Sequence, residues 1–431
     1  MSFDAPFRPK RRIAIVGAGI SGLASAYLLA PDHDVTVFEA ENRLGGHART
    51  IMAGQRGNVA VDTGFIVFNY PNYPNLTAMF DALDVPVKKS DMSFGASIDG
   101  GRIEYGLQTL NQVFGQRRNM VRPEFLGMVR DILRFNKGAI DALRDDNQTI
   151  GDLIDEMGLG DWFMRYYLMP LCGAIWSTPP AGVRAYPAAS LVHFFKNHAL
   201  LSTTGQHQWW TVDGGSIEYV TLLERHLRRL GVTFHMGAKV RAVTRTANGV
   251  TIRAKGGVAM HFDEVIMASH SDQSLAMLTD ATPQEQSALG DLTYQPNRVL
   301  LHADTSQMPK RRSCWSSWIY KADNAGAETK LGVTYWMNRL QGLPENDPLF
   351  ISLNPASSVR EELIYDEVSF DHPLFDTAAM AAQKRLAALQ GTNRTWFAGA
   401  YMRNGFHEDG FHSAAEVARQ IADTSVAMAA Q

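Results

Sequence analysis

The chain has 431 residues, of which 45% are hydrophobic and 20% are charged, and its formal net charge is −3. This composition is typical of a folded protein rather than a disordered one, and the length predicts two domains. The slightly negative charge excludes a bulk attraction to nucleic acid or anionic lipid, so we expect no nucleic-acid partner.

Signals for export, membrane insertion and disulfide bonding are weak along the chain. Residues 6–12 are basic, but a strand and a glycine turn follow them in place of an apolar signal core. No run of about 18 or more uncharged apolar residues predicts a membrane span. Cys172 and Cys314 are the only cysteines, and they lack C-x-x-C spacing and evident metal partners. We therefore expect a cytoplasmic protein without disulfides or a bound metal.

The first element is an apolar run at residues 13–17, which predicts a strand buried on both faces of a parallel sheet. Gly17, Gly19 and Gly22 supply GxGxxG before a helix over residues 21–30 that begins at Ser21. The first glycine permits a tight turn, the second lets backbone approach a diphosphate, and the third lets the helix pack on the strand. The helix N-terminus favours the negative charge of phosphates.

The next strand, residues 35–38, ends at Glu39, whose carboxylate can accept hydrogen bonds from the ribose hydroxyls of an adenosine. Strand, turn, helix, strand and acid in this order predict a dinucleotide site. Arg43 can bind a phosphate bidentately, and Gly45 and Gly46 allow a second close approach of backbone to an extended ligand. These residues favour FAD over NAD, the rival dinucleotide.

The middle of the chain reads as an insertion followed by further sheet elements. Residues 69–75 predict a turn before a helix over 76–83, and residues 99–201 have a largely helical pattern, broken at Pro170 and at 178–180. We expect this insertion to cap the cofactor. Gly214 and Gly215 precede a helix over 217–230, and the strands that follow are predicted at residues 232–243, 249–253 and 262–269.

Residues 294–355 are rich in predicted strands, which we assign to the sheet of a substrate domain: 298–302, 315–320 and 332–337. The chain closes with a strand over 394–399 and an alanine-rich helix over 413–430. Cofactor-type sequence stands at both ends, so the FAD-binding domain is expected to be discontinuous. Its predicted parts are residues 8–85, 205–290 and 391–431, and the substrate and cap domain takes residues 86–204 and 291–390.

The N-terminal pattern resembles the flavin-containing amine oxidase superfamily, whose signature is GxGxxG, an acid, and then RxGGRxxT. Thr50 completes the match, and His47 replaces the usual arginine. The chain is most similar to a bacterial branch of predicted FAD-binding oxidoreductases with GFHEDG-type tails, here residues 405–410. The resemblance implies an α/β fold, with a Rossmann-type FAD domain containing a parallel sheet and a crossover β-hairpin, plus a mixed α+β substrate domain. It also implies acyl substrates, because members of this branch often accompany cyclopropane-fatty-acid-synthase-like methyltransferases.

The same resemblance implies further cofactor contacts. Val240 would hold the adenine through its backbone, and a turn near the C-terminus would lead into a helix directed at the flavin pyrimidine. The residues assigned to this region are Gly399, Asp409, Gly410 and Phe411. Ala400 stands where many members have an aspartate.

Three residues are candidates for catalysis. His407 stands about where amine oxidases place a tyrosine that encloses the substrate nitrogen, and the strand at 297–303 lacks the lysine those enzymes use, with His302 as its nearest titratable group. His407 and Glu408 are candidates for proton transfer because they adjoin the flavin turn and imidazole titrates near neutral pH. Neighbouring residues point in different directions, so we expect one of the two to be structural. Packing of His407 on the cofactor rim is the alternative to a chemical role.

Two clusters of side chains each allow two interpretations. The first lies in or beside the insertion and is mostly aromatic, and its residues either line an apolar pocket or form the core of the insertion: Trp162, Tyr166, Tyr167, Met169, Trp176, Phe194, Phe195, Trp209 and Trp210. The basic run Lys310, Arg311 and Arg312, followed by Trp315 and Trp318, either touches the inner face of a membrane or is a solvated loop.

The sequence thus predicts an enzyme with non-covalent FAD, since neither cysteine lies in the terminal flavin motif. The expected reaction is hydride exchange between flavin N5 and a carbon of a lipophilic substrate, introducing, removing or moving an acyl double bond. The alternatives are a flavin amine oxidase and a non-catalytic flavoprotein that supports a lipid methyltransferase.

Overall fold

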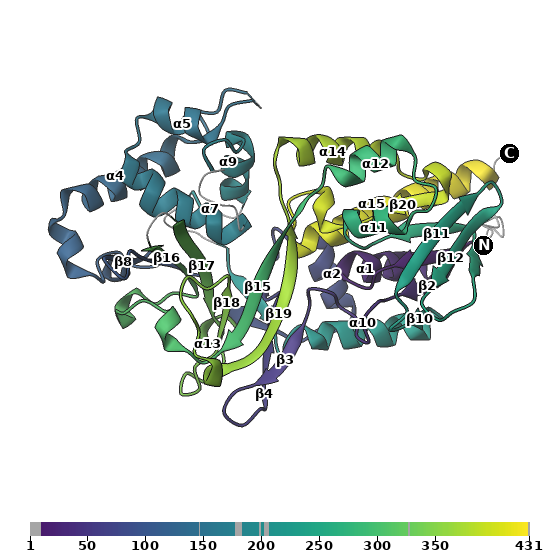
Figure 1. Ribbon diagram of the computed structural model, residues 1–431, viewed down its shortest axis with the longest axis horizontal. Coiled ribbons are helices and arrows are strands. Elements are labelled where there is room, and N and C mark those ends of the chain that lie inside the picture. The colour runs from purple at the N-terminus through teal and green to yellow at the C-terminus, as the bar shows by residue number, and fades with distance from the viewer. Residues whose placement is uncertain are drawn as a thin grey trace, which may run out of the picture.

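The computed structural model describes residues 10–145, 147–176, 183–197, 200–201, 207–325 and 328–429. A parallel sheet organises one end of the molecule and a larger mixed sheet the other (Figure 1). The predicted break at 178–180 lies outside the described residues. Within the described part, no helix is long and apolar enough to cross a membrane.

The parallel sheet has five strands, with β1 (Arg12–Val16) at its centre. The strand β1 pairs with β2 (Asp34–Phe38) on one side and with β14 (Glu264–Met267) on the other. The edge strands are β10 (Thr233–His235), which pairs with β2, and β20 (Thr395–Phe397), which pairs with β14. All four pairings are parallel. Four of the five β1 residues are buried, as expected for a strand covered on both faces.

Helices cover one face of this sheet, and a mixture of strands and helices covers the other. On the first face lie α1 (Ile20–Leu29), α10 (Ile217–Arg229) and α15 (His407–Ala429), which share a core with Ile13 and Ile15 of β1. Ala14 and Val16 pack in the core of the second layer. That layer comprises an antiparallel sheet and three helices: β11 (Val240–Thr246), β12 (Gly249–Ala254), β13 (Met260–Phe262), α11 (Ser271–Met277), α12 (Pro283–Gly290) and α14 (Thr377–Ala388). The Rossmann-type half of the predicted fold is confirmed.

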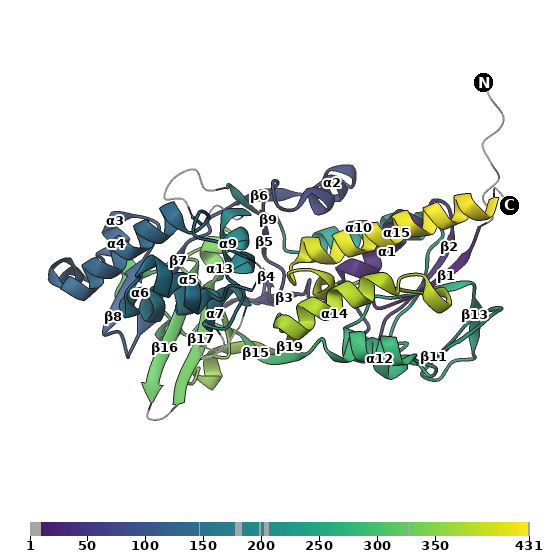
Figure 2. The ribbon, with the colours of Figure 1, turned by 90° about the horizontal axis from the view of Figure 1, so that it is seen from above.

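The mixed sheet has seven strands in the order β19-β15-β18-β17-β16-β7-β8, and only the β16–β7 pairing is parallel. Their bounds are β7 (Phe94–Ile98), β8 (Ile103–Gly106), β15 (Tyr294–His302), β16 (Trp318–Ala325), β17 (Glu328–Trp336), β18 (Phe350–Leu353) and β19 (Ile364–Pro373). The insertion packs on this sheet around an aromatic core, at the opposite end of the molecule from the C-terminal end of α15 (Figure 2).

The insertion begins with strand β8, so its first residues are not helical as predicted. Its helices are α3 (Leu110–Val113), the 3₁₀ helix η1 (Arg117–Val121), α4 (Pro123–Gly138), α5 (Ile150–Met157), α6 (Asp161–Phe163), the π-helix η2 (Met164–Leu168), α7 (Met169–Trp176) and α9 (Ala188–Asn197). The predicted break at Pro170 is wrong: α6, η2 and α7 follow one another without interruption, and the π-helix η2 lies directly before the turn that contains Pro170.

Short elements join the two sheets. The hairpin of β3 (Thr50–Ala53) and β4 (Val59–Asp62) packs against the mixed sheet, although its sequence directly follows the first glycine motifs. A small sheet combines three distant segments, β5 (Val67–Phe68), β9 (Trp209–Val212) and β6 (Val87–Ser90). The predicted domain limits therefore stay a prediction.

The remaining short helices are α2 (Pro74–Ala82), α13 (Met337–Leu340), η3 (Thr305–Gln307), η4 (Arg312–Cys314), η5 (Glu361–Leu363), η6 (Thr392–Arg394) and η7 (Ala400–Met402).

Buried Asp62 holds these segments together. Its carboxylate accepts hydrogen bonds from Thr50 Oγ1 at 2.6 Å, from Ser216 N and Oγ at 2.8 and 2.7 Å, and from Gln341 Nε2 at 3.0 Å. Burial raises its pKa to about 6 even though these donors favour the charged form. One side chain thus connects the start of β3, the start of α10 and the loop after α13.

Two predicted boundaries are wrong, each for a local reason. The last helix begins at His407 rather than at residue 413, because the Asp409 carboxylate accepts from Phe406 N and closes the first turn. The predicted strand at 232–243 is two strands, β10 and β11, in different sheets. Gly237 separates them, with a φ of +62° that a strand residue does not adopt.

A Gly22→Ala change tests the packing of α1 on β1. A Cβ at Gly22 would lie 1.9 Å from Gly17 O, so we expect loss of bound flavin and a lower melting temperature. The matched control is Gly127→Ala in α4, where no atom lies within 4 Å of the added Cβ, and this change should stabilise the protein by about 1 kcal/mol. Flavin absorbance per protein and thermal unfolding measure both, and a Gly22→Ala protein that keeps its flavin and stability would contradict the packing.

Candidate functional site

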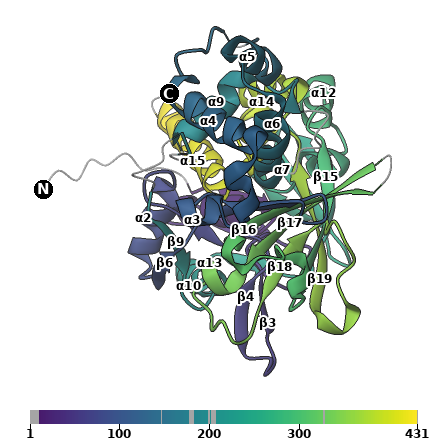
Figure 3. The ribbon, with the colours of Figure 1, turned by 90° about the vertical axis from the view of Figure 1, so that its left-hand side faces the viewer.

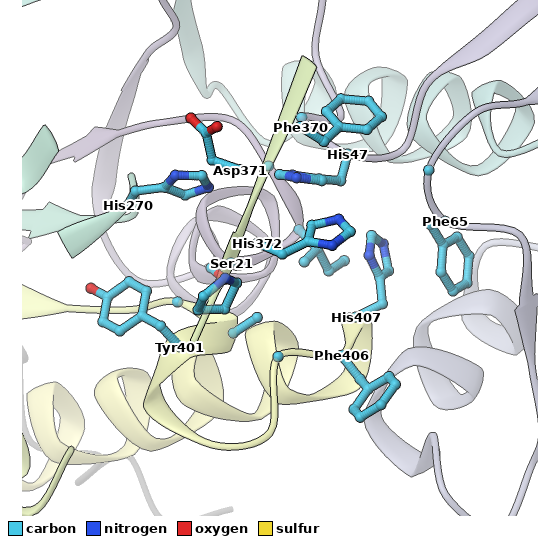
Figure 4. Close-up of a pocket in the computed structure, with 18 of the residues that line it drawn as sticks. Ser21, His47, Phe65, His270, Phe370, Asp371, His372, Tyr401, Phe406 and His407 are labelled. Carbon is cyan, nitrogen blue, oxygen red and sulfur yellow. The ribbon is translucent and has the colours of Figure 1, made fainter. Parts of the chain in front are cut away.

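A cavity of about 830 Å³ lies between the two sheets. Its walls come from the turns after β1 and β2, from the carboxyl end of β14, from the start of α15 and from strands of the mixed sheet. Ligands of open α/β sheets bind at this carboxyl edge of the parallel strands. Figure 4 shows side chains from these separate segments converging on the same space.

Two glycine turns meet along one wall, formed by Gly17, Gly19, Gly45 and Gly46. Gly45 N donates to Ala18 O at 2.8 Å, and a Cβ at Gly46 would lie 3.0 Å from Gly19 Cα. Glycine is required here because the two backbones approach too closely for side chains. The result is a wall of peptide groups that a phosphate-bearing ligand can approach.

The predicted polar groups beside this wall also face the cavity. The helix α1 begins just after Gly19, and no side chain caps its first N–H groups, so its positive end is free for an anion. Ser21 and Val240 line the same space. Glu39 stands at the end of β2, where its carboxylate accepts from Ala18 N at 2.8 Å and orients toward the glycine turn.

The start of α15 forms a second helix N-terminus at the cavity. Gly399 and His407 line it, whereas Asp409, Gly410 and Phe411 lie behind, inside the first turns of the helix. A Cβ at Gly410 would lie 2.8 Å from Ser21 Oγ, so this glycine lets α15 pack against the start of α1. These three predicted cofactor residues are therefore supports rather than lining. Gly22 is a support as well, beneath the first turn.

His407 is held by two aromatic side chains. Its ring stacks on Phe65 with centroids 4.0 Å apart, and its Nε2 lies 2.7 Å from Tyr219 Oη. Burial lowers the pKa of His407 to about 3, so the imidazole is neutral at physiological pH. With Nε2 bound to Tyr219, the other ring nitrogen of this neutral imidazole can form one hydrogen bond to a ligand in the cavity. The ring is a weak base.

Three more histidines line the cavity: His47, His270 and His372. The His47 ring centroid lies 5.9 Å from that of His270 and 6.0 Å from that of His372 (Figure 4). Burial is the main cause that lowers all three pKa values, to about 3 for His47 and about 4 for His372. The cavity thus has several neutral imidazoles and little positive charge of its own. Among the described residues, no group of three or more His, Cys, Asp or Glu side chains could hold a metal.

Three residues that line the cavity were not predicted from the sequence: His270, His372 and Phe65. His270 lies three residues after the end of β14, at the sheet edge where ligands bind, so its position was detectable. Phe65 follows Gly64, where a Cβ would lie 2.0 Å from His47 O, and that contact depends on tertiary structure. His372 reaches the cavity from β19 only because the mixed sheet places it there.

The other half of the cavity is apolar. Its lining includes aromatic and aliphatic side chains from the mixed sheet, the insertion and β9: Met92, Phe94, Leu107, Tyr167, Leu171, Phe194, Leu200, Trp209, Trp318, Tyr335, Ile351 and Leu353. Of the predicted pocket aromatics, Tyr167, Phe194 and Trp209 belong to this lining, and Tyr166 and Phe195 are buried in the core of the insertion. Trp162 and Met169 pack against that core, whereas Trp210 pairs in β9 and contacts Tyr70.

Several other predicted residues have partners away from the cavity. Arg43 Nε lies 2.8 Å from Glu41 Oε2, and Arg43 does not line the cavity in the described structure. The basic run near residue 310 is also engaged: Lys310 Nζ donates to Gly100 O, Arg311 pairs with buried Glu104, and Arg312 pairs with Glu345. Both cysteines are buried, and neither lines the cavity.

Glu408, a predicted catalytic residue, caps a helix instead. Its carboxylate accepts from Asn75 N at 3.1 Å, from Asn75 Nδ2 at 2.6 Å and from Leu76 N at 3.0 Å, at the N-terminus of α2. It does not line the cavity. Of the two neighbouring candidates, Glu408 is therefore the structural one.

His302 is likewise a structural residue. It is fully buried in β15, with Nε2 2.8 Å from Ser352 Oγ and Nδ1 accepting from Asp304 N at 3.0 Å. Burial lowers its pKa to about 4. Both ring nitrogens are occupied, and the ring lies outside the cavity lining.

A Glu408→Ala change should reduce the free energy of unfolding by about 2 kcal/mol, because it removes the cap of α2 and leaves buried amides unpaired. Flavin absorbance should be unchanged. The control is Glu416→Ala on α15, where the ion pair to Arg419 is exposed and the expected change is below about 0.5 kcal/mol. Denaturant unfolding measures both, and lost turnover with unchanged stability in Glu408→Ala would contradict the capping role.

His302 should make the protein sensitive to acid. Its pKa is about 4 in the fold against an ordinary 6.5, so the unfolded chain binds a proton first and stability falls as the pH drops below 6.5. In His302→Gln this loss is absent. The amount by which the free energy of unfolding of the wild type exceeds that of the variant should therefore decrease by about 2 kcal/mol from pH 7 to pH 5. Denaturant titrations at both pH values measure it, and a difference independent of pH would contradict the buried neutral imidazole.

Comparison with known proteins agrees with this geometry. The profile of the family described as flavin containing amine oxidoreductase matches residues 20–317. Protoporphyrinogen oxidase 2 of Arabidopsis thaliana is 56% identical over 43 residues, which cover 10% of this chain and 8% of that protein. The chain therefore matches only a small part of its curated relatives.

Solved structures match over nearly their whole length. A CLA-producing fatty acid isomerase from P. acnes superposes with a TM-score of 0.69 at 16% identity, covering 95% of this chain and 98% of that one. A putative protoporphyrinogen oxidase from Exiguobacterium sp. 255-15 gives a TM-score of 0.69 at 17% identity, covering 96% and 99%. At these identities the likeness establishes the fold alone, which is the predicted amine-oxidase-like one. The family match over residues 20–317 leads to the conclusion that this protein belongs to the flavin-containing amine oxidoreductase family.

Proposed function

We propose that this oxidoreductase exchanges a hydride with a carbon atom of an apolar, acyl-type substrate, so that a double bond is introduced, removed or moved. The observation that carries the proposal is the large apolar lining that shares one cavity with the glycine turns. Burial of an alkyl chain against such a lining is favourable by about 0.8 kcal/mol per CH₂ group. A long hydrocarbon chain therefore fits this half of the cavity.

The residues of the other half fit non-covalent FAD. The peptide groups of Gly17, Gly19 and Gly45 and the start of α1 would hold the diphosphate, and Glu39 and Val240 would hold the adenosine. The N-terminus of α15 would lie toward the flavin ring, where a positive helix end favours the reduced cofactor. FAD supplies hydride chemistry when bound, which these side chains alone do not have.

His407 is the residue we assign to positioning at the reacting centre. Its stacking on Phe65 and its hydrogen bond to Tyr219 fix the ring, and its low pKa keeps it neutral. It can donate or accept one hydrogen bond without carrying charge. A role as a general base near pH 7 does not fit these surroundings.

The lining also disfavours a charged amine. Among the described residues that line the cavity, the carboxylates are Glu39, which is engaged by Ala18 N, and Asp371, which lies beside His270 (Figure 4). An alkylammonium seated on the apolar lining would lack a carboxylate partner there. The fatty acid isomerase of similar fold supports an acyl substrate. Amine oxidation is the second candidate function, favoured by the family match.

Anaerobic mixing with matched ligands tests the proposal. The purified flavoprotein is incubated with long-chain saturated and unsaturated fatty acids and, separately, with an alkylamine of the same chain length. We expect flavin bleaching or a change in double-bond position with the fatty acids, followed by absorbance and by mass spectrometry, and neither with the amine. Bleaching by the amine alone would favour amine oxidation and overturn the proposal.

His407→Asn should reduce the catalytic rate on the order of a hundredfold while flavin stays bound, because the reacting groups lose a positioning contact. The wild-type pH profile should show no ionisation of His407 between pH 5 and pH 8, since its pKa is about 3. A wild-type break near pH 6.5 that disappears in His407→Asn would show that the imidazole titrates and would contradict the neutral role.

A further inference from the structure

The insertion exposes an unusual share of the protein's apolar surface. In the described part of the chain, twelve large apolar side chains are exposed, and half of them lie between residues 110 and 140: Leu110, Met120, Val121, Leu126, Leu133 and Ile140. Leu110 is 77% exposed and Val121 is 82% exposed. Isolated exposed apolar residues are common, but a concentration in one segment marks an interaction surface.

The helix α4 arranges part of this surface in a regular row. Leu126, Arg130, Leu133, Lys137 and Ile140 follow one another at spacings of four and three residues, so they lie on one face of the helix and its C-terminal extension. All five are exposed. We call this row the α4 stripe. It alternates apolar and basic side chains along its length.

The opposite face of α4 holds the helix in the fold. Phe125, Met128, Phe135 and Ala139 are buried there in the aromatic core of the insertion. The α4 stripe is therefore not needed to attach the helix to the protein, and its composition requires another explanation. Figure 3 views the molecule from the side on which α4 lies, and Figure 1 places α4 at the outer end of the insertion, far from the parallel sheet.

The charge around the α4 stripe selects the kind of partner. Residues 110–140 contain six basic side chains and two acidic ones, whereas the whole chain has a net charge of −3. The acidic residues, Glu124 and Asp131, lie outside the stripe, although Asp131 pairs with Arg130 and Arg134. Arg117 and Arg118 donate to amide and carbonyl oxygens, which leave their positive charge in place.

We infer that the α4 stripe docks this protein on the surface of an anionic lipid bilayer. Leucine and isoleucine side chains of an interfacial helix enter the boundary between head groups and acyl chains, and adjacent Arg and Lys side chains bind anionic head groups. The long aliphatic stems of these basic residues reach outward while their charges stay at the head groups. Because the α4 stripe combines apolar and basic side chains, one face of one helix supplies both the hydrophobic and the electrostatic contribution to reversible attachment.

The position of the surface relative to the cavity supports a lipid over a protein partner. Leu107 and Gln108 line the main cavity, and the exposed Leu110 follows two residues later in α3. A second, shallower cavity of about 460 Å³ shares Gln108 with the main one and is also lined by Arg312 and Arg339. A bilayer at this face would therefore lie next to a polar, partly aromatic approach to the apolar half of the site, in which Arg312 is paired with Glu345 and Arg339 with Asp91. The docking itself goes beyond the proposed function and does not depend on which substrate reacts.

Vesicle co-sedimentation of the flavin-bound, full-length protein tests the inference. We expect binding to vesicles of phosphatidylcholine mixed with phosphatidylglycerol, weaker binding to pure phosphatidylcholine, and a decrease at high ionic strength. The double variants Leu126→Gln/Leu133→Gln and Arg130→Gln/Lys137→Gln should each lower the partition coefficient by about tenfold. Flavin absorbance and melting temperature confirm that each variant is folded.

Matched controls lie on α10 at the other end of the molecule. Ile217→Gln/Leu230→Gln removes exposed apolar side chains and Arg225→Gln/Arg229→Gln removes exposed charge, and both should bind vesicles as the wild type does. An environment-sensitive dye on Leu133→Cys should shift its emission to the blue with anionic vesicles, and one on Ile217→Cys should not. Both native cysteines are buried, so each variant offers one accessible thiol.

Three outcomes would overturn the inference. The first is a wild type that does not bind anionic vesicles. The second is equal loss of binding in the α4 and α10 variants. The third is self-association that disappears in the α4 variants without vesicle binding, which would assign the surface to a second copy of the chain. None of these outcomes depends on turnover, so failure of the docking is distinguishable from failure of the proposed reaction.

Discussion

The close approach of two backbone turns is the constraint on which this structure depends. The turn after β1 and the turn after β2 touch at glycines, with Gly45 N donating to Ala18 O. Because Gly19 and Gly46 carry no side chain where the two backbones approach each other, the wall they form presents peptide groups and a helix N-terminus to the cavity. The supports behind this wall have the same character: Gly22 lets α1 pack on β1, and Gly410 lets α15 pack on α1.

The second organising feature is the separation of polar and apolar chemistry within one cavity. The glycine wall and neutral imidazoles occupy one part, and the side chains of the mixed sheet and insertion occupy the other. His407 stands at the first turn of α15 with its ring on Phe65, so it belongs to both the cofactor-type wall and the aromatic surroundings. Under the proposed function, this arrangement would place a charged, extended cofactor beside a hydrocarbon, with few ionised groups near the reacting atoms.

Local patterns were predictable from the sequence, and distant contacts were not. The strand, glycine turn and terminal acid at Glu39 lie within a short stretch whose spacing is set by backbone geometry, so their placement followed from the chain itself. The role of Glu408 depends on the N-terminus of α2, more than 300 residues away, and no local pattern reports that contact. His302 was predicted as a site residue because it is the nearest titratable group on the strand where amine oxidases carry a lysine. In the structure, Ser352 of the neighbouring strand lies 2.8 Å from its Nε2. The start of α15 was predicted too late in the chain because Gly410 resembles a turn residue. In the structure Gly410 lies inside the helix, where the absence of a side chain lets α15 pack on α1.

The order of the segments has a consequence for synthesis. The edge strand β20 and the helix α15 lie in the final part of the described chain, yet they complete the sheet and the wall that begin at β1. A nascent chain that has not reached residue 395 exposes the unpaired edge of β14, whose Val265, Ile266 and Met267 are fully buried in the finished molecule. Such edges are sites of aggregation and of recognition by chaperones. The cavity wall is therefore incomplete in a nascent chain until β20 and the start of α15 have been synthesised.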